Sequence, residues 1–581
     1  MKALSRLSLT TLAALAIASC YSTGDGTPPP TDRIYFPVGL AVSRGGNVLY
    51  VANSDFDLQY SGGTLQSYNL QKVRTDAAAQ AALPCNVPAS PADGSSPTRV
   101  GETCAPPVDS RSYFREGAII GAFATDAQVL SCEREPLTDA ERLAPETQCA
   151  DAGKRLFVPV RGDASITWAT LDLDDPAVAP PTGDADNATN YPPYRIQCGA
   201  DQNGGRCSDA FRAGRPSDVG NSRRLSMPGE PFGMSQSQDG TFLLLTHQTD
   251  GNVSLLSTGV SRASASASLT VPSLQWVLGD NTIGGTSIAP IPHDRALRCV
   301  GGLPCSNEPV APAFVQTSRY VAGLDVFRLY RDEGARRIED PNLPAPQPSL
   351  PRPYLIREGT VPISTNIGGA DSRGVVVDRS PRLACKAKVR DNRPASEAEF
   401  KRRMEDCARL PARVFIANRS PASLIVGEVG ADDQGTASPD RITLKTSIPL
   451  SFGPSRLYLA PIVDRSGRYA LRVFVVCFDA SMVFVYDPEA DRIENVIRMG
   501  LGPFAMAFDP FDMEQVAAHA LAPKDTRAGA PADLLRYRFA YVASFTNSYI
   551  QVIDLDNSRA NKDTFERVVF TLGIPTDPKG S

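Results

Sequence analysis

Short runs of alternating apolar and polar residues recur along this chain in pairs. An apolar run that ends in a small polar residue is followed, after a short break, by a second alternating run. The three clearest pairs are Leu49–Asn53 with Thr64–Tyr68, Val414–Asn418 with Ser423–Val426, and Ala540–Ser544 with Tyr549–Asp554. Such short alternation is typical of half-buried strands, and its recurrence is typical of repeat architectures.

A template of four strands per unit fits the chain seven times, with no long helical period between units. The predicted first strands are Val38–Val42, Ile119–Ala124, Phe232–Ser235, Thr286–Ala289, Gly374–Val377, Arg456–Ala460 and Phe504–Phe508. Short strands bounded by Gly, Pro and Asp predict an all-β fold, and sheets of this kind arranged radially form a β-propeller. We therefore predict a single seven-bladed propeller over residues 37–575, followed by a disordered C-terminus, 576–581. Because the middle units match the four-strand template less clearly than the units at the ends, six or eight blades also fit.

Long insertions interrupt the predicted blades: 71–117, 125–154, 174–222, 290–312, 330–359, 378–412 and 509–537. In an antiparallel meander, the loops after the first and third strands emerge on one face of the disc, and all other connections emerge on the opposite face. Every insertion falls after a first or third strand, except 71–117, which the sequence does not assign. We therefore expect a crown of insertions on one face and a nearly bare second face.

Several of these segments resemble a known repeat. Leu49–Asn53, Gly229–Met234 with Asp239-Gly240, and Ala540–Ser544 through Asp554 are similar to the YVTN-type, lactonase-like propeller repeat. The resemblance covers the strands of about half the blades and none of the insertions. It implies the propeller fold, but that superfamily includes sugar-lactone hydrolases, surface proteins and binding scaffolds, so the resemblance leaves activity open.

The N-terminus has the pattern of an export signal. Lys2 and Arg6 precede an apolar run from Leu7 to Ala18, and Ile17-Ala18-Ser19-Cys20 resembles the lipobox of bacterial lipoproteins. The resemblance implies a signal peptide, 1–19, and a lipid-modified Cys20 at the start of a flexible tether, 20–36. Tyr21 follows the cysteine where an aspartate would resemble an inner-membrane retention signal. We expect a lipid-anchored protein of the cell envelope, most simply of the outer membrane.

The charge of the exported chain disfavours nucleic acid as a partner. Of the 59 basic residues, Lys2 and Arg6 are lost with residues 1–19, which leaves 57 against 64 acidic residues and a net charge of −7. No block of Lys and Arg interrupts this acidic balance. Binding to a phosphate backbone requires such basic patches.

Cysteines other than Cys20 and Cys477 fall into five close couples within irregular segments. Because exported proteins meet an oxidising compartment, we predict that each couple forms a disulfide, although spacing alone does not fix the connectivity. The predicted pairs are Cys85–Cys104, Cys132–Cys149, Cys198–Cys207, Cys299–Cys305 and Cys385–Cys407. A metal site is disfavoured because no C-x-x-C occurs and only three histidines exist. Cys477, inside an apolar run, is expected to be a buried, unreactive thiol.

Polar residues cluster in the turns expected on the bare face, around the mouth of the channel. These candidate binding residues are Asp55, Asp57, Asp163, His247, Asp250, Asn418, Arg419, Asp479 and Asn547. A mouth lined by carboxylates could hold a calcium ion or position a water for lactone opening. Asn and Asp are also common turn formers that bond their own backbone, so we predict no cofactor and keep calcium as the alternative.

Two functions fit the sequence. No G-x-S-x-G, H-E-x-x-H, Walker or EF-hand motif is present, which favours a non-catalytic, lipid-anchored propeller that binds envelope proteins through its crown. The alternative is a lactonase-like hydrolase, or another enzyme acting on a small ligand, with its site at the channel mouth. Because the chain would enter its first strand at Pro37 from the bare face, the crown should point away from the anchoring membrane.

Overall fold

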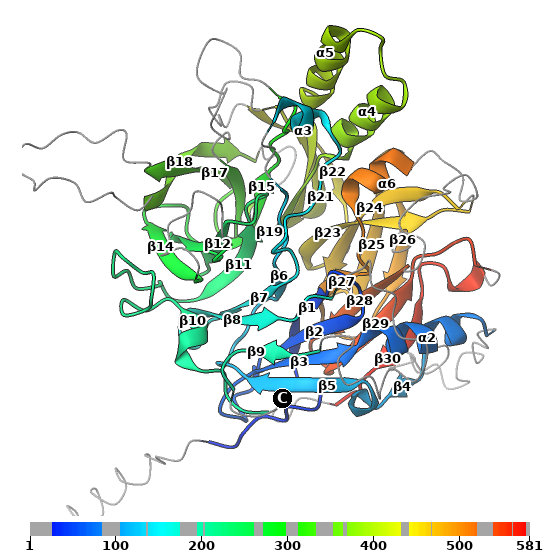
Figure 1. Cartoon of the computed structure of the whole chain (residues 1–581). Helices are drawn as coiled ribbons and strands as arrows, with labels where there is room; N and C mark the ends of the chain where they lie inside the picture. The colour runs from blue at the N-terminus through cyan, green and yellow to red at the C-terminus, as the bar shows by residue number, and fades with distance from the viewer. Residues whose placement is uncertain are drawn as a thin grey trace, which may run out of the picture.

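The structure is a computed structural model that describes most of the chain. The described residues are 26–83, 105–134, 138–174, 194–200, 204–260, 271–297, 312–332, 352–363, 369–431, 441–465, 467–519, 538–559 and 562–576. Seven antiparallel sheets are arranged around one axis, which confirms the predicted seven-bladed propeller (Figure 1).

Each blade is a four-stranded meander numbered here from the axis outward. Blade 1 contains β1 (Pro37–Val42), β2 (Val48–Asn53), β3 (Thr64–Asn69) and β5 (Phe114–Ile119). Blade 2 contains β6 (Gln128–Val129), β7 (Arg155–Val160) and β8 (Ser165–Leu171), and its outer strand is divided into β9 (Ile196–Gln197) and β10 (Arg212–Ala213). Blade 3 contains β11 (Pro231–Gln236), β12 (Phe242–His247), β13 (Val253–Ser257) and β14 (Ser273–Leu278).

The remaining four blades follow the same plan. Blade 4 contains β15 (Gly285–Ile291), β16 (Ala313–Ser318), β17 (Gly323–Asp332) and β18 (Arg352–Pro362). Blade 5 contains β19 (Ser372–Asp378), β20 (Ala412–Arg419), β21 (Ala422–Val429) and β22 (Ile442–Pro449). Blade 6 contains β23 (Pro454–Val463), β24 (Tyr469–Cys477), β25 (Met482–Asp487) and β26 (Arg492–Arg498). Blade 7 contains β27 (Pro503–Phe508), β28 (Phe539–Ser544), β29 (Tyr549–Asp554) and β30 (Val568–Leu572).

One predicted strand was wrong. The segment Ile119–Ala124 was expected to open blade 2, but Ile119 ends β5 and pairs with Thr64 of blade 1. The first strand of blade 2 is the two-residue β6, and Ala124 adds only an isolated bridge to Val160. The apolar content of Ile119–Ala124 exceeds that of β5, whose sequence carries two charges and a glycine, and this misled the assignment.

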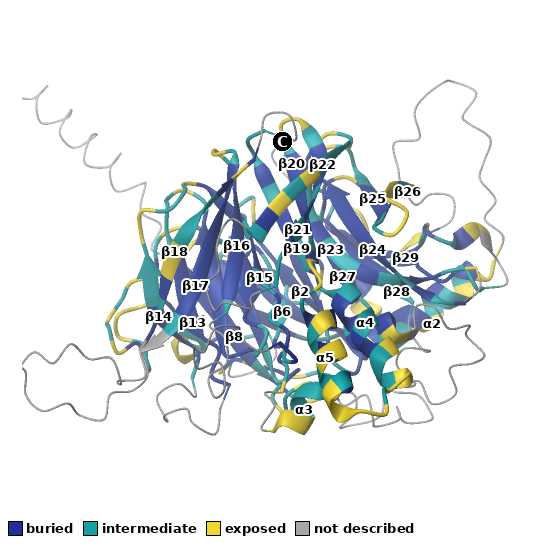
Figure 2. Ribbon diagram, turned by 90° about the horizontal axis from the view of Figure 1, so that it is seen from above, coloured by how far each residue is buried: buried dark blue, intermediate teal, exposed yellow. Residues whose placement is uncertain are grey.

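The hydrophobic cores lie between neighbouring blades, because both faces of each sheet are covered. Val38 and Tyr50 of blade 1 pack with Leu156 and Val158 of blade 2 in one such cluster. The same arrangement joins blade 7 to blade 1, where Leu40 and Tyr541 belong to one cluster. The buried strands therefore form a continuous ring, seen in dark blue in Figure 2.

A strand from an insertion closes the ring. The predicted insertion 71–117 overlaps β5, so the insertion between β3 and β5 is 70–113; it contains α2 (Leu70–Ala81), β4 (Pro107–Val108) and the short helix η1 (Ser110–Ser112). The sequence did not assign this insertion to a face, and its place after a third strand puts it with the others. Strand β4 pairs in parallel with β30, so blade 1 supplies a fifth strand to blade 7.

The other helices belong to a crown on one side of the disc. They are α3 (Asp139–Leu143), α4 (Ser380–Asp391), α5 (Glu397–Ala408) and α6 (Met513–His519). All four follow first strands, of blades 2, 5 and 7. Helices α3, α4 and α5 project from the same side in Figure 2, and α6 pairs with α4 through Glu514 and Arg390. On the opposite, bare side, none of the loops between second and third strands exceeds ten residues. The link 214–230 is longer and follows the outer strands, where Arg223 donates to the carbonyl oxygens of Gln275 and Pro353.

Three of the predicted disulfides are present: Cys132–Cys149, Cys198–Cys207 and Cys385–Cys407. The first and third lie in the crown. Cys198–Cys207 instead packs in the core between blades 1 and 2, so its expected place in the crown was wrong. Cys477 is free and buried, as predicted, and burial raises the pKa of its thiol to about 12. The predicted pairs Cys85–Cys104 and Cys299–Cys305, and Cys20, lie outside the described residues.

The segment assigned to a tether is partly packed against blade 1. Described residues begin at Gly26, and the Ser61 N–H donates to the Thr27 carbonyl at 2.9 Å. The side-chain amide of Gln66 donates to the carbonyl oxygens of Thr31 and Arg33 at 2.9 and 2.8 Å. The part of the tether that the structure leaves undescribed is therefore 20–25 rather than 20–36.

Candidate functional site: the axial cavity and its crown

A cavity of about 660 Å³ occupies the axis of the propeller and extends into the crown. Its walls come from the first strands of five blades: β6, β11, β15, β19 and β23. Cavities of roughly 300 to 1,000 Å³ are typical of sites for small ligands. The cavity is therefore large enough for a metabolite.

The walls combine apolar and amide groups. Ile288, Val375 and Leu457 supply apolar surface. Gln128 donates from Nε2 to the Met234 carbonyl at 2.8 Å, and Gln236 donates to the Val129 carbonyl at 3.0 Å. These two amides join blades 2 and 3 across the rim of the cavity, where β6 is too short to do so through its backbone.

Arg456 closes the side of the cavity that faces blades 1 and 7. From β23 it reaches the Asp126 carboxylate at 3.2 Å and the Thr125 carbonyl at 2.7 Å. Its guanidinium lies 4.5 Å from the ring centre of Phe504. This contact joins blade 6 to blade 2 and leaves β1 and β27 outside the cavity lining.

The close approach of blades 1 and 2 requires a glycine. A Cβ at Gly39 would lie 2.4 Å from the Asp126 carbonyl carbon and 2.5 Å from the Ala127 nitrogen. Only a residue without a side chain allows the two backbones to meet at this distance.

Buried charged groups join the crown to the roof of the cavity. Arg379, directly after β19, bonds to Glu133 and lies 3.0 Å from a Glu146 oxygen. Lys386 Nζ on α4 lies 3.1 Å from Glu146 and 3.2 Å from Asp294. These groups come from the insertions of blades 2, 4 and 5, so the three insertions share one ionic cluster.

The carboxyl groups of this cluster differ in their pKa. Burial raises the pKa of Glu133, and the nearby Glu146 carboxylate acts in the same direction against Arg379. Burial alone would also raise the pKa of Glu146 and Asp294, but the adjacent cations, Lys386 above all for Asp294, outweigh it and hold both below their ordinary values. Glu133 is therefore the carboxyl group of this cluster whose pKa is raised, and it remains paired with Arg379.

Further contacts fix the crown as one unit. Arg390 of α4 forms an ion pair with Glu514 of α6, and the same glutamate accepts a hydrogen bond from the Glu146 N–H. Phe400 and Met404 of α5 pack with Ala296 and Leu297 of the blade 4 insertion. The Cys385–Cys407 disulfide joins α4 to α5. Insertions from four blades therefore form one packed platform, gathered on one side of Figure 1.

The residues predicted for a channel-mouth site all occur in or beside bare-face turns, but they are spread over six blades. Asp163 bonds to Ser165 at 2.5 Å and to Arg212 at 3.0 Å, within blade 2. Asp250 accepts from the Asn252 N–H at 3.2 Å. The Asn418 side chain accepts from Ser372 and donates to the Pro421 carbonyl. Arg419 and Asp479 form an ion pair between blades 5 and 6, and Thr576 N donates to the Asn547 carbonyl.

The remaining predicted residues are also engaged locally. His247 is fully buried, and its ring nitrogens lie 2.8 Å from the Gly229 carbonyl and from Ser254 Oγ. Burial lowers the pKa of His247, which favours the neutral ring. Asp57 accepts a hydrogen bond from Tyr35, and Asp55 accepts from the Tyr60 N–H at 3.2 Å. Burial raises the pKa of Asp55 to about 7. Among these residues, the structure brings Asp55 close to Asp57 and Arg419 close to Asp479, and does not bring all nine together.

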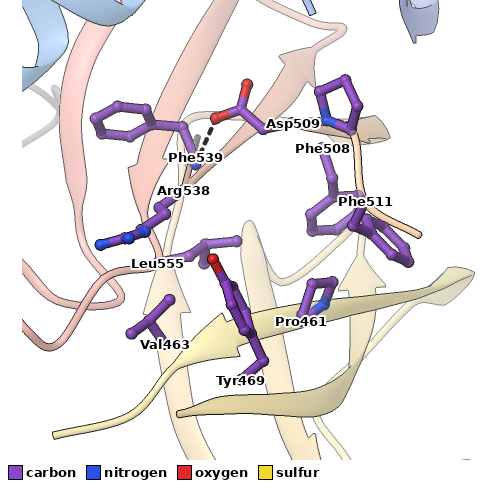
Figure 3. A pocket seen from close by; sticks show the side chains of 10 residues that line it. Pro461, Val463, Tyr469, Phe508, Asp509, Phe511, Arg538, Phe539 and Leu555 are labelled. Carbon is purple, nitrogen blue, oxygen red and sulfur yellow. Dashed lines mark hydrogen bonds between the residues drawn. The ribbon is translucent and has the colours of Figure 1, made fainter. Parts of the chain in front are cut away.

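A second, smaller pocket lies where the crown-side ends of blades 6 and 7 meet (Figure 3). Asp509 sits at its edge, where one oxygen accepts from the Phe539 N–H at 2.9 Å and the other from Tyr541 at 2.8 Å and Arg74 at 3.1 Å. The pocket has a volume of about 20 Å³. That is room for about one water molecule, so the pocket is no candidate for a larger ligand.

Searches for metal and membrane-spanning elements were negative for the part of the chain that the structure describes. There, no group of three His, Cys, Asp or Glu side chains is arranged to hold a metal ion. Within the same residues, no helix is long and apolar enough to cross a bilayer.

Known proteins resemble this chain only at low sequence identity and low structural similarity. No family model matches the chain, and no curated protein sequence matches it. Similar solved structures include hydrazine synthase of Kuenenia stuttgartiensis, with 9% identity over 92% of this chain and 99% of that one and a TM-score of 0.39. A 6-phosphogluconolactonase-like protein of Bacteroides uniformis has 12% identity over 82% and 87%, with a TM-score of 0.37. The Cps50 (Swd1) propeller domain of Myceliophteria thermophila has 7% identity over 90% and 98%, with a TM-score of 0.38.

Proposed function

We propose that this protein is a lipid-anchored β-propeller of the bacterial cell envelope that binds a protein partner through its crown and performs no catalysis. The observation that supports this proposal is the platform itself. Insertions from four blades are joined by buried ions and a disulfide into one rigid surface. Rigidly held loops on a stable scaffold are the usual location of binding residues.

The outer surface of the crown suits a polar partner surface. On α5, Arg402 and Glu399 pair with each other, and their side chains are 61% and 32% exposed. Arg403 also contacts Glu399, and Arg402 also contacts Asp406. Charges of both signs, held in order by mutual contacts, favour recognition by electrostatic complementarity.

The anchor part of the proposal rests on the lipobox-like sequence and on the three disulfides. Structural disulfides persist in oxidising compartments such as the periplasm or the cell surface. We assign the protein to the outer membrane because Tyr21 follows Cys20.

Site-specific photo-crosslinking in intact cells tests the crown. A crosslinking residue at Arg402 of α5 should give a discrete adduct with one protein. The same residue at Arg498, exposed on the outer strand β26 of blade 6, is the control and should give none. Adducts at both positions, or at neither, would contradict binding through the crown.

The axial cavity favours a second candidate, which is binding or turnover of a small ligand such as a lactone. Its size and the protonatable Glu133 beside Arg379 support this alternative, on the crown side of the channel rather than at the predicted mouth. Purified protein assayed against a panel of lactones separates the two functions. Turnover that is lost in Glu133→Gln but kept in Asp163→Asn would establish a catalytic site in this cavity. Turnover that is lost in Asp163→Asn would instead place the site at the predicted channel mouth.

A further inference from the structure

The bare face carries most of the exposed apolar surface of the described residues. Fourteen large apolar side chains are exposed among the described residues. Eight of them lie in bare-face loops, although this face is the less elaborate of the two. They include Phe56, Leu58, Ile283, Tyr320, Phe452 and Leu501.

Topology places these residues together. Phe56 and Leu58 lie between β2 and β3, and Tyr320 lies between β16 and β17. Phe452 and Leu501 lie in links between blades, before β23 and β27. Loops after second and fourth strands emerge on one side, so the blades present these side chains in the same direction. Phe452 is 81% exposed and Leu58 is 60% exposed.

Aromatic rings beneath this surface hold part of it in place. Phe56 lies 5.3 Å from Phe545 and 6.1 Å from Phe123, centre to centre. Phe545 in turn lies 6.2 Å from Phe478. Loops of blades 1, 6 and 7 therefore share one aromatic layer. Apolar patches of this kind on an otherwise polar monomer mark interaction sites.

The N-terminal segment leads to this surface. Gly26 lies against Ser61 of the β2–β3 loop, the loop that also carries Phe56 and Leu58. Cys20 is six residues earlier, and a fully extended chain of this length spans only about 20 Å. A lipid on Cys20 would hold the bilayer within that distance of the bare face.

We infer that the bare face docks on the surface of a phospholipid bilayer, with Phe452, Leu501 and Phe56 inserted among the headgroups. This inference rests on the proposed lipid anchor and deepens it. Aromatic and aliphatic side chains at the interface add to a lipid anchor by burying apolar area. Contact between the bare face and the membrane, in addition to the tether, then orients the crown away from the membrane.

Depth-dependent quenching of tryptophan fluorescence tests the inference on the full lipidated chain. The protein is reconstituted into vesicles of phosphatidylethanolamine and phosphatidylglycerol with brominated acyl chains. The Phe452→Trp variant should lose part of its added fluorescence, as expected for an indole buried at interfacial depth. The matched control is Leu410→Trp, which is exposed on the crown side and should lose none.

Flotation of the same vesicles separates the inference from the anchor. Chains with Cys20 should float and chains with Cys20→Ser should not. If the lipidated chain floats but Phe452→Trp is unquenched, the docking is overturned and the anchor stands, as it would be if a protein covered the bare face instead. If the lipidated chain does not float, the anchor is overturned, and the docking with it.

Discussion

Removal of the Lys386 amine gives the sharpest test of how the crown is held together. Lys386 is nearly fully buried and lies 3.1 Å from Glu146 and 3.2 Å from Asp294. In Lys386→Met, both carboxylates lose their shared cation in a buried site. Loss of one partner of a buried ion pair costs about 3 to 5 kcal/mol, because the remaining charge is left uncompensated; here that charge is mainly Asp294, since Glu146 keeps Arg379 at 3.0 Å.

Hydrogen exchange measures this loss where it occurs. At about 1.4 kcal/mol per factor of ten, amides of α4 should exchange roughly 10²- to 4 × 10³-fold faster in Lys386→Met. The control is Lys388→Met, which removes an exposed lysine from the same helix. Equal exchange in the two variants would refute the assignment of Lys386 as the cation that holds the crown insertions together.

The defect should also depend on pH, with a sign that the structure fixes. The pKa values of Glu146 and Asp294 lie below their ordinary values in the folded protein. Their contribution to stability is therefore present above the ordinary carboxyl range and is lost as pH falls through the lowered values. In Lys386→Met the part of this contribution that Lys386 supplies is absent, so the difference from the wild type should shrink toward acid pH. A difference that grows toward acid pH would contradict the reasoning.

Three further predictions follow from single residues. Gly39→Ala forces a Cβ to within 2.4 Å of the Asp126 carbonyl carbon and should lower the free energy of unfolding by about 1 to 3 kcal/mol, whereas Gly229→Ala, with open space around its Cβ, should be neutral in the same denaturation assay. The raised pKa of Asp55, from 3.8 to about 7, means that the folded state holds this proton more tightly than the unfolded state; Asp55→Asn should therefore raise the melting temperature relative to the wild type most at pH 8 and change it little at about pH 3, below both pKa values, and the reverse order would refute burial as the cause. Cys477, whose pKa is raised to about 12, should resist thiol alkylation at pH 8 in the native protein and react after denaturation; rapid native labelling would contradict its burial.

The alternation of apolar and polar residues predicts most of this fold because the strands are local. Sequences such as Leu49–Asn53 are long enough to show their period, and they form β2 and its counterparts as predicted. Blade 2 departs from the pattern because β6, β9 and β10 have two residues each. A strand of that length has no detectable period of apolar residues. Its position is set by contacts with neighbouring blades.

The candidate cavity was not predicted, because its chemistry depends on contacts between distant residues. Lys386 and Glu146 are 240 positions apart, and Arg379 and Glu133 are 246 apart. Because these insertions all follow first strands, the sequence predicts that they share a face. It does not predict which of their many charges are buried. The sequence signal that could have indicated Arg379 is its position directly after an apolar first strand. Of the turn residues predicted instead, Asp250 accepts from the Asn252 N–H, as the turn interpretation expects, whereas Asp163 contacts the Ser165 hydroxyl and Arg212.

The pairing of β4 with β30 has a consequence for biogenesis. Strand β4 contains residues 107 and 108, and its partner ends at Leu572, near the end of the chain. When the chain is synthesised from its N-terminus, the edge that β4 offers stays without its native partner until β30 has been made. A chain that stops before β30 would expose that unpaired edge, which is a template for aggregation. Closure of the ring at β4 therefore waits for the last strand of blade 7.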